Sequence, residues 1–201
     1  MEEQEKDYYH TLYEIAAAVN SAGTTDNVLL SIVERTAKTL AAKGCSLMLL
    51  TPDRKTLLHA TAHGLSDWYV RKGPVSADRS IAEALKGRPV AVLNATEDDR
   101  IQYQKQAKDE GIASILSVPV MLKEEVVGVI RVYTAEPCRF TDADIYFVGA
   151  VANLGAIALE NARLYDSAKK DYEELRRDVA EWHAALGYEW MVEEPVLPAR
   201  E

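Results

Sequence analysis

The chain contains two pairs of short apolar segments, each pair separated by a charged turn. Residues 45–51 and 56–63 flank a Pro-Asp-Arg-Lys turn, and residues 114–122 and 126–134 flank a Lys-Glu-Glu turn. Because short apolar segments bounded by turn residues are typical of strands, each pair predicts a β-hairpin. The first segment is apolar on both of its faces, which indicates a sheet that is covered on both sides.

Two details refine this sheet. In the second segment His59, Thr61 and His63 alternate with apolar residues, so all three are expected on one face of the strand. Pro119 has no N–H to donate to a ladder, so it predicts an edge position or a bulge. Residues 90–94 predict one further strand.

Helices are expected between these strands. Apolar residues at helical spacing predict a helix over residues 5–20. They also predict a second helix that Thr24 or Thr25 caps, that runs through Leu40 and that ends at Lys43-Gly44. An S-x-x-E capping box at 80–83 predicts a short helix, and residues 95–111 predict a loop with a short helix. A capped start at Thr141 predicts a long helix that extends to about residue 186. The fold class is therefore α+β.

Composition excludes several classes of protein. The net charge of -9 and the pI of about 5.0 argue against a nucleic-acid-binding surface, and no basic block occurs. Cys45 and Cys138 lie far apart, which fits a reducing compartment and predicts neither a disulfide nor a metal site. The N-terminus is acidic and no apolar run approaches about 18 residues. We expect a cytoplasmic protein with no nucleic acid or membrane partner.

The long C-terminal helix also carries a seven-residue repeat, the period of a coiled-coil seam. The predicted dimer interface combines this seam with the apolar face of the first helix. It comprises Leu12, Ile15, Val19, Val151, Leu154, Ala158, Asn161, Tyr165, Ala168, Tyr172, Leu175, Val179 and Trp182. The alternative is an amphipathic helix that folds back on its own domain.

Four stretches together resemble a GAF domain, a small-molecule sensor module. TLLHATAHGLS is similar to its second strand and strand exit, and SIAEALKGRPVAV to its lid helix and following strand. ILSVPVMLKEEVVGVIRVYT is similar to its last hairpin, and RFTDADIYFVGAVANLGAIALENARLYD to its C-terminal helix. The resemblance covers roughly residues 24 to 165.

The resemblance implies a PAS-like antiparallel sheet of five or six strands, with helices on one face and a pocket lid on the other. The expected organisation is an N-terminal helix in a dimer bundle (1–22), a sensor domain (23–165), a coiled-coil extension (166–187) and a loose tail (188–201). Such modules bind a small ligand or dimerise, and pass a signal along their terminal helices.

No cofactor is indicated by motif. Cyclic-nucleotide binders of the family carry Asn-Lys and Phe-x-x-x-Asp-Glu, whereas Phe140 is followed here by Asp144 and Ile145. Neither cysteine has the setting of a bilin-binding cysteine, and the several pocket cysteines of the methionine-sulfoxide reductases are missing. Haem would depend on His59 or His63 alone.

The candidate pocket residues are His63, Trp68, Tyr69, Ser80, Ser117, Arg131 and Tyr133. Trp68 and Tyr69 either close the open face of the sheet or form a ligand wall. Arg131, if buried, must meet a carboxylate of the chain or receive an anion. His63 is either internally bonded or part of the site.

These residues predict a homodimeric sensor rather than an enzyme, because no G-x-S-x-G, H-E-x-x-H or P-loop occurs. Occupancy of the pocket would pass through the helical stalk to a separate output protein if the chain is complete. One alternative is a ligand-free dimerisation scaffold with a filled pocket. Another is a minor enzymatic or redox role for Cys45 or Cys138.

Overall fold

The computed structural model describes residues 2–21, 23–77 and 82–185. The chain divides into two compact units, the first ending at Ala158 and the second beginning at Leu159. The first unit contains every strand assigned in the described ranges, and the second is helical as far as Ala185.

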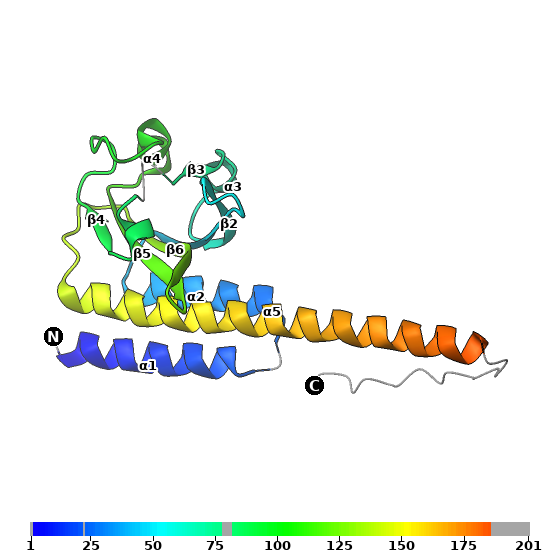
Figure 1. The fold of residues 1–201 in the computed structure, drawn as a ribbon. Coiled ribbons are helices and arrows are strands. Elements are labelled where there is room, and N and C mark those ends of the chain that lie inside the picture. The colour runs from blue at the N-terminus through cyan, green and yellow to red at the C-terminus, as the bar shows by residue number, and fades with distance from the viewer. Residues whose placement is uncertain (1, 22, 78–81, 186–201) are drawn as a thin grey trace. The chain divides into compact units, whose positions relative to one another are not determined.

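The first unit is built on one antiparallel sheet of six strands in the order β3-β2-β1-β6-β5-β4 (Figure 1). The strands are β1 (Gly44–Leu50), β2 (Thr56–His63), β3 (Val75–Ser76), β4 (Val90–Val92), β5 (Ser114–Leu122) and β6 (Glu125–Thr134). Both predicted hairpins are present, as β1–β2 and β5–β6. The short strand β3 was not predicted, since two residues carry no detectable pattern.

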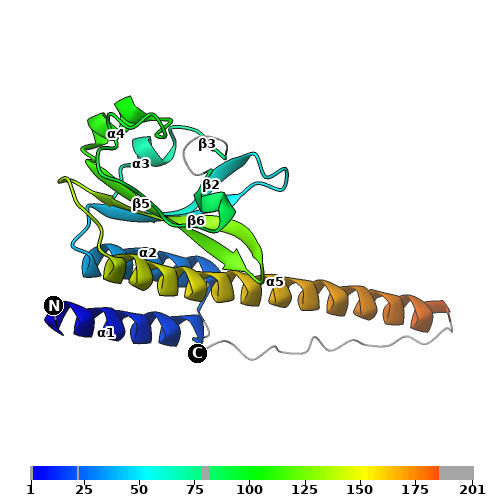
Figure 2. The ribbon, with the colours of Figure 1, turned by 60° about the vertical axis from the view of Figure 1, so that its left-hand side comes forward.

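The central strands are buried on both faces, as the apolar first segment predicted. Five consecutive residues of β1 and seven of β5 are buried. One face is covered by α2 (Thr25–Thr39) and the first part of α5 (Asp142–Ala185), and the opposite face by α3 (Asp67–Val70) and α4 (Gln104–Glu110) (Figures 1 and 2). We call the face under α3 and α4 the lid face. It matches the side on which the sequence places the lid.

Helix α1 (Glu2–Val19) packs within the first unit, against α2 and the start of α5. Tyr8 stacks on Phe147 with 4.4 Å between ring centroids, and its hydroxyl donates a hydrogen bond to Asp144. The hydroxyls of Thr11 and Thr39 lie 2.7 Å apart. Helix α1 is therefore joined to the rest of the first unit by both apolar and polar contacts.

A bulge reverses the predicted alternation of β2. Leu47 pairs with Thr61, but the next residue, Met48, pairs with His59, so the register shifts by one residue between them. Opposed residues in an antiparallel pair share a face, and an extra residue exchanges the faces beyond it. His59 therefore shares the lid face with Met48. His63 pairs with Cys45 on the helix-covered face, so the prediction of one common face is wrong.

Pro119 lies where the sequence expected it. Strand β4 pairs with β5 only from Ile115 to Ser117, so Pro119 lies beyond the end of β4, on a part of β5 that has a partner on one side. A register irregularity follows between Val120 and Met121. An edge position and a nearby bulge are both present.

Helix starts follow their capping residues. The Thr24 side chain accepts a hydrogen bond from the Asn27 amide, and Thr141 and Asp144 cap each other reciprocally at the start of α5. The capping box at 80–83 begins outside the described residues. The next described element is a short 3-10 helix, η1 (Ala84–Lys86), which ends at Gly87 in the left-handed conformation.

Several predicted interface residues pack inside a single chain. Ile15 and Val151 are fully buried and Ala158 is 6% exposed, so these three belong to the core of the first unit. The sequence had predicted them at an interface between two chains. In the second unit the corresponding residues are exposed: Tyr165, Tyr172, Leu175, Val179 and Trp182.

Helix α5 also contains an 18-residue window of mean hydropathy 1.3, long and apolar enough by composition to cross a membrane. The sequence predicted no apolar segment of about 18 residues, and for α5 that prediction is wrong. Of that window 44% is buried inside the protein, and the core helix of a soluble protein has the same composition.

Two glycines allow a matched test of the β2 exit. Gly64 and Gly87 both have positive φ, but a Cβ on Gly64 would lie 2.2 Å from the Lys43 carbonyl oxygen, whereas one on Gly87 meets nothing within 4 Å. We expect Gly87→Ala to cost about 1–2 kcal/mol, from backbone strain alone. Gly64→Ala should cost at least about 2 kcal/mol more, because the backbone must also move. Urea unfolding of both variants measures the difference, and equal losses would contradict the close packing at Gly64.

Candidate functional site

The lid face carries two apolar clusters. One joins α3 and α4 to β4, β5 and β6, and consists of Tyr69, Val92, Ala95, Ile101, Ala107, Ile112, Ile115 and Tyr133. The other joins β1, β2 and β6 to β3 and η1, and consists of Met48, Leu57, Val75, Ala84 and Val129. Leu65, predicted as a core residue after the strand exit, packs against the first cluster.

Polar side chains occupy the centre of this face, on the three middle strands. Ser46 pairs with Arg131 across β1 and β6, and Arg131 pairs with Ser117 across β6 and β5, so all three share one face. Each is at most 4% exposed. The Arg131 Nε donates to Ser117 Oγ at 3.1 Å, and Ser46 Oγ lies 3.0 Å from the Tyr133 hydroxyl. The face thus contains a buried cation and three hydroxyls.

The segment after β2 carries two aromatic residues, Trp68 and Tyr69, and only Tyr69 packs against the sheet. Ser66 caps α3 by accepting from the Tyr69 amide. Tyr69 is 2% exposed and meets Tyr133 edge to face, with centroids 6.0 Å apart. Burial raises the pKa of both phenols, so both stay protonated. Trp68 is 53% exposed. Tyr69 therefore closes the sheet, and Trp68 faces solvent.

Lys72 is a second cation at this face, and the sequence did not single it out. Its Nζ donates to the Tyr69 carbonyl at 2.9 Å and lies 3.6 Å from the centre of the Tyr69 ring. Burial lowers the pKa of Lys72 to about 8, and the Arg131 charge adds to this effect. The Glu110 charge raises the pKa of Lys72, against the effect of burial. The Glu110 carboxylate itself accepts hydrogen bonds from the Ser66 amide and hydroxyl.

His59 is the third nitrogen-bearing side chain at this face. Both of its ring nitrogens are buried, and neither has a hydrogen-bond partner in the described part of the chain. Burial lowers its pKa to about 4, with smaller contributions from the Lys72 and Arg131 charges. The imidazole is therefore neutral at pH 7 and offers one donor and one acceptor that the described residues leave unused.

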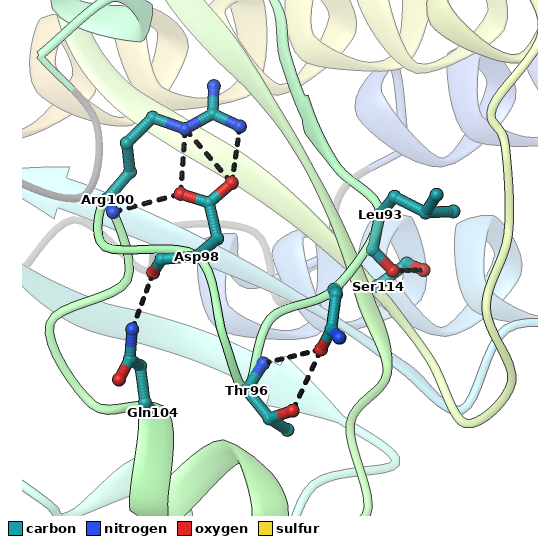
Figure 3. A network of polar contacts seen from close by, with 7 residues as sticks. Leu93, Thr96, Asp98, Arg100, Gln104 and Ser114 are labelled. Carbon is teal, nitrogen blue, oxygen red and sulfur yellow. Dashed lines mark hydrogen bonds and ion pairs between the residues drawn. The ribbon is translucent and has the colours of Figure 1, made fainter.

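The loop between β4 and α4 is held by local polar contacts (Figure 3). The Asp98 carboxylate accepts from the Arg100 backbone amide at 2.9 Å and from its guanidinium, which lowers the pKa of Asp98. Gln104 donates to the Asp98 carbonyl, and Thr96 donates to Asn94. The acidic run at 97–99 is thus part of a structured loop.

The structure brings together four of the seven predicted pocket residues: Tyr69, Ser117, Arg131 and Tyr133 lie on or over the lid face. His63 lies on the opposite face, where it makes a small contribution, after Lys38, to lowering the pKa of Glu34 on α2. Ser80 lies outside the described residues.

Three residues of the site were missed. Ser46 lay in an apolar run, and Lys72 was one charged residue in a predicted loop. His59 was considered only as a haem ligand. Among the described residues no group of three or more His, Cys, Asp or Glu side chains could hold a metal ion.

The family model described as "GAF domain" matches residues 22–160. The chain belongs to the GAF domain family. This range includes every strand of the sheet and the first part of α5. The fold, with its antiparallel sheet and long C-terminal helix, is the one that the sequence motifs implied.

Two much longer proteins are similar in sequence to this GAF domain. A methyl sulfide methyltransferase-associated sensor of Methanosarcina acetivorans is 24% identical over 165 residues, which is 79% of this chain and 16% of that protein. A dual cyclic-AMP and cyclic-GMP phosphodiesterase 11A of Takifugu rubripes is 30% identical over 126 residues, which is 59% of this chain and 13% of that protein. The chain therefore spans less than a fifth of either relative.

Among solved structures, the GAF domain of a phosphoenolpyruvate-protein phosphotransferase from Coxiella burnetii superposes with a TM-score of 0.72. It is 19% identical, and the match covers 81% of this chain and 98% of that one. This likeness supports the fold assignment.

The neutral, buried state of His59 predicts how stability depends on pH. Its pKa is about 4 in the folded protein and near 6.5 when exposed, so between these values the unfolded chain binds more protons. The free energy of unfolding should therefore fall as the pH drops from 6.5 to 4. The His59→Gln variant should lose part of this slope in urea titrations at several pH values. His10→Gln, at a side chain that is 72% exposed, is the control and should keep it. Identical slopes in all three proteins would contradict a buried neutral His59.

Proposed function

We propose that this GAF domain is a sensor that binds a small organic molecule on the lid face and transmits its occupancy through a dimeric helical stalk. The observation that carries the proposal is the buried polar centre of that face, bordered by two apolar clusters. His59, with two buried nitrogens that lack partners among the described residues, is its most informative member. Buried polar groups are normally hydrogen-bonded, so a ligand that supplies those bonds accounts for this arrangement.

The family and its relatives support a signalling role. One similar protein is a methyltransferase-associated sensor and another is a cyclic-nucleotide phosphodiesterase, each much longer than this chain. A regulatory rather than catalytic role, a cytoplasmic location and a separate output partner are parts of the same proposal. A ligand can shift the stalk only by binding one of its states more tightly than the other.

The second unit supports dimeric transmission. At its heptad positions Tyr165, Tyr172, Leu175, Val179 and Trp182 are between 45% and 62% exposed. Such a series of apolar side chains at coiled-coil spacing is stabilised when a second helix covers it. Asn161, also at a seam position, is exposed and would help to set the register.

A second function from another class is a dimerisation scaffold that binds no ligand. Tyr69 favours this alternative, since it fills space over the sheet with its own ring and contacts Tyr133. The two functions differ in one measurable respect, which is whether a small molecule binds between the lid and the sheet.

Native mass spectrometry of gently purified protein distinguishes them. We expect a dimer of twice 22.3 kDa that carries an additional small mass, and this mass should leave on denaturation. The Arg131→Met variant should carry less of it, because the cation at the centre of the site is removed. A dimer without added mass, in protein that also binds no member of a metabolite library, would favour the scaffold.

The stalk is tested by one pair of substitutions. Leu175→Glu places a charge at a seam position whose side chain is 62% exposed in the single chain, so it should weaken the dimer at least about tenfold. Arg177→Glu changes the charge by more, but lies at an outer heptad position and should leave the dimer unchanged. Sedimentation velocity over a range of concentrations measures both. If Leu175→Glu assembles like the unaltered protein, the stalk is not the interface.

A further inference from the structure

The three nitrogen-bearing side chains of the lid face are not equally satisfied. The Arg131 Nε is already used by Ser117. Lys72 has hydrogen-bond and ring contacts with Tyr69, but among the described residues it forms no ion pair with a carboxylate. No described residue pairs with either nitrogen of His59. A negative charge for Lys72 and hydrogen-bond partners for His59 would complete this site.

Glu110 does not supply the negative charge for Lys72. Glu110 is the carboxylate that acts on Lys72, yet it accepts from the Ser66 amide at 2.8 Å and from the Ser66 hydroxyl. It therefore secures the start of α3 to the end of α4. Taking an ammonium group partly out of water is costly unless an opposite charge compensates, and the lowered pKa of Lys72 expresses that cost.

We infer that the ligand of the lid face is a small carboxylic acid, whose carboxylate binds Lys72 and accepts a hydrogen bond from the His59 imidazole. This inference rests on the proposed small-molecule function and adds the chemical class of the ligand. A carboxylate has two oxygens that can accept from the two groups at once. Its negative charge would compensate the Lys72 ammonium, which forms no ion pair with a carboxylate among the described residues.

The surroundings define the rest of the molecule. Apolar clusters lie on both sides of the polar centre. One includes Tyr69 and Tyr133 among aliphatic side chains, and the other consists of Met48 and aliphatic side chains. Tyr69 and Tyr103 lie near the Lys72 ammonium, with centroids at 3.6 and 5.6 Å. A carboxylate that carries a compact apolar or aromatic group fits these neighbours better than a sugar or a polyamine does.

The test compares acids with their own amides. Benzoate and benzamide, phenylacetate and phenylacetamide, and isovalerate and isovaleramide are added at millimolar concentration to the full chain. Each pair keeps its shape and differs in charge. We expect at least one acid to raise the Tm and its amide to raise it far less, with at least a tenfold difference in affinity by calorimetry. Inorganic phosphate serves as the non-carboxylate anion and should bind more weakly than that acid.

Three variants connect the effect to Lys72. Lys72→Gln should reduce the affinity for the acid at least tenfold, and Lys72→Arg, which keeps the charge, should retain most of it. Lys55→Gln removes an exposed lysine from the turn between β1 and β2 and should change nothing. In the unaltered protein the acid should also raise the pKa of His59 in imidazole NMR spectra, because a negative charge stabilises the protonated ring. This readout does not depend on the stability of any variant.

The outcomes separate this inference from the proposed function. Equal binding of an amide and its acid, full affinity in Lys72→Gln, or tighter binding of phosphate would overturn the carboxylate assignment and leave a small-molecule sensor standing. A retained natural ligand without a carboxylate would do the same. No binding of any acid or amide, an unchanged His59 spectrum and no retained mass would overturn both.

Discussion

The central strands of this protein are buried on both faces, and most of the structure follows from that constraint. Most residues of β1, β5 and β6 are buried, so neither side of the sheet can face water. Burying apolar area contributes about 25 cal/mol per Å², and each face therefore requires its own cover. Helix α2 and the first part of α5 supply one cover. The less regular segments of α3, α4 and η1 supply the other.

The difference between the two covers explains where a ligand-binding site can lie. Helices satisfy their own backbone hydrogen bonds and bury smooth apolar stripes, so the helix-covered face is filled by side chains such as Leu47. The lid face instead receives short elements and loops, held by polar contacts such as those of Asp98 (Figure 3) and those of Glu110. Polar side chains can therefore be buried between such elements, and Arg131, Ser46 and Ser117 lie there.

The terminal helices divide their apolar residues between two tasks. In α1 and the first part of α5 some of these residues complete the core of the first unit, as the stacking of Tyr8 on Phe147 illustrates. In the second unit apolar residues at seven-residue spacing are exposed. One continuous sequence pattern thus includes residues that stabilise a single chain and residues that a second helix could cover. Periodicity alone does not distinguish them, because both kinds of partner select the same helical face.

The α+β class, both hairpins, and the capped starts of α2 and α5 could be predicted from the amino-acid sequence, and four candidate pocket residues lie together on or over the lid face. Those four are Tyr69, Ser117, Arg131 and Tyr133. The fold features rest on alternation, capping residues and strand order, which are properties of neighbouring residues. Which histidine joins the site became clear only from the folded chain. One extra residue in β2 turns His59 toward the lid and His63 away from it, and no local pattern marks that residue. Lys72 likewise acquires its role through burial against Tyr69, and burial depends on segments that meet only when the chain is folded.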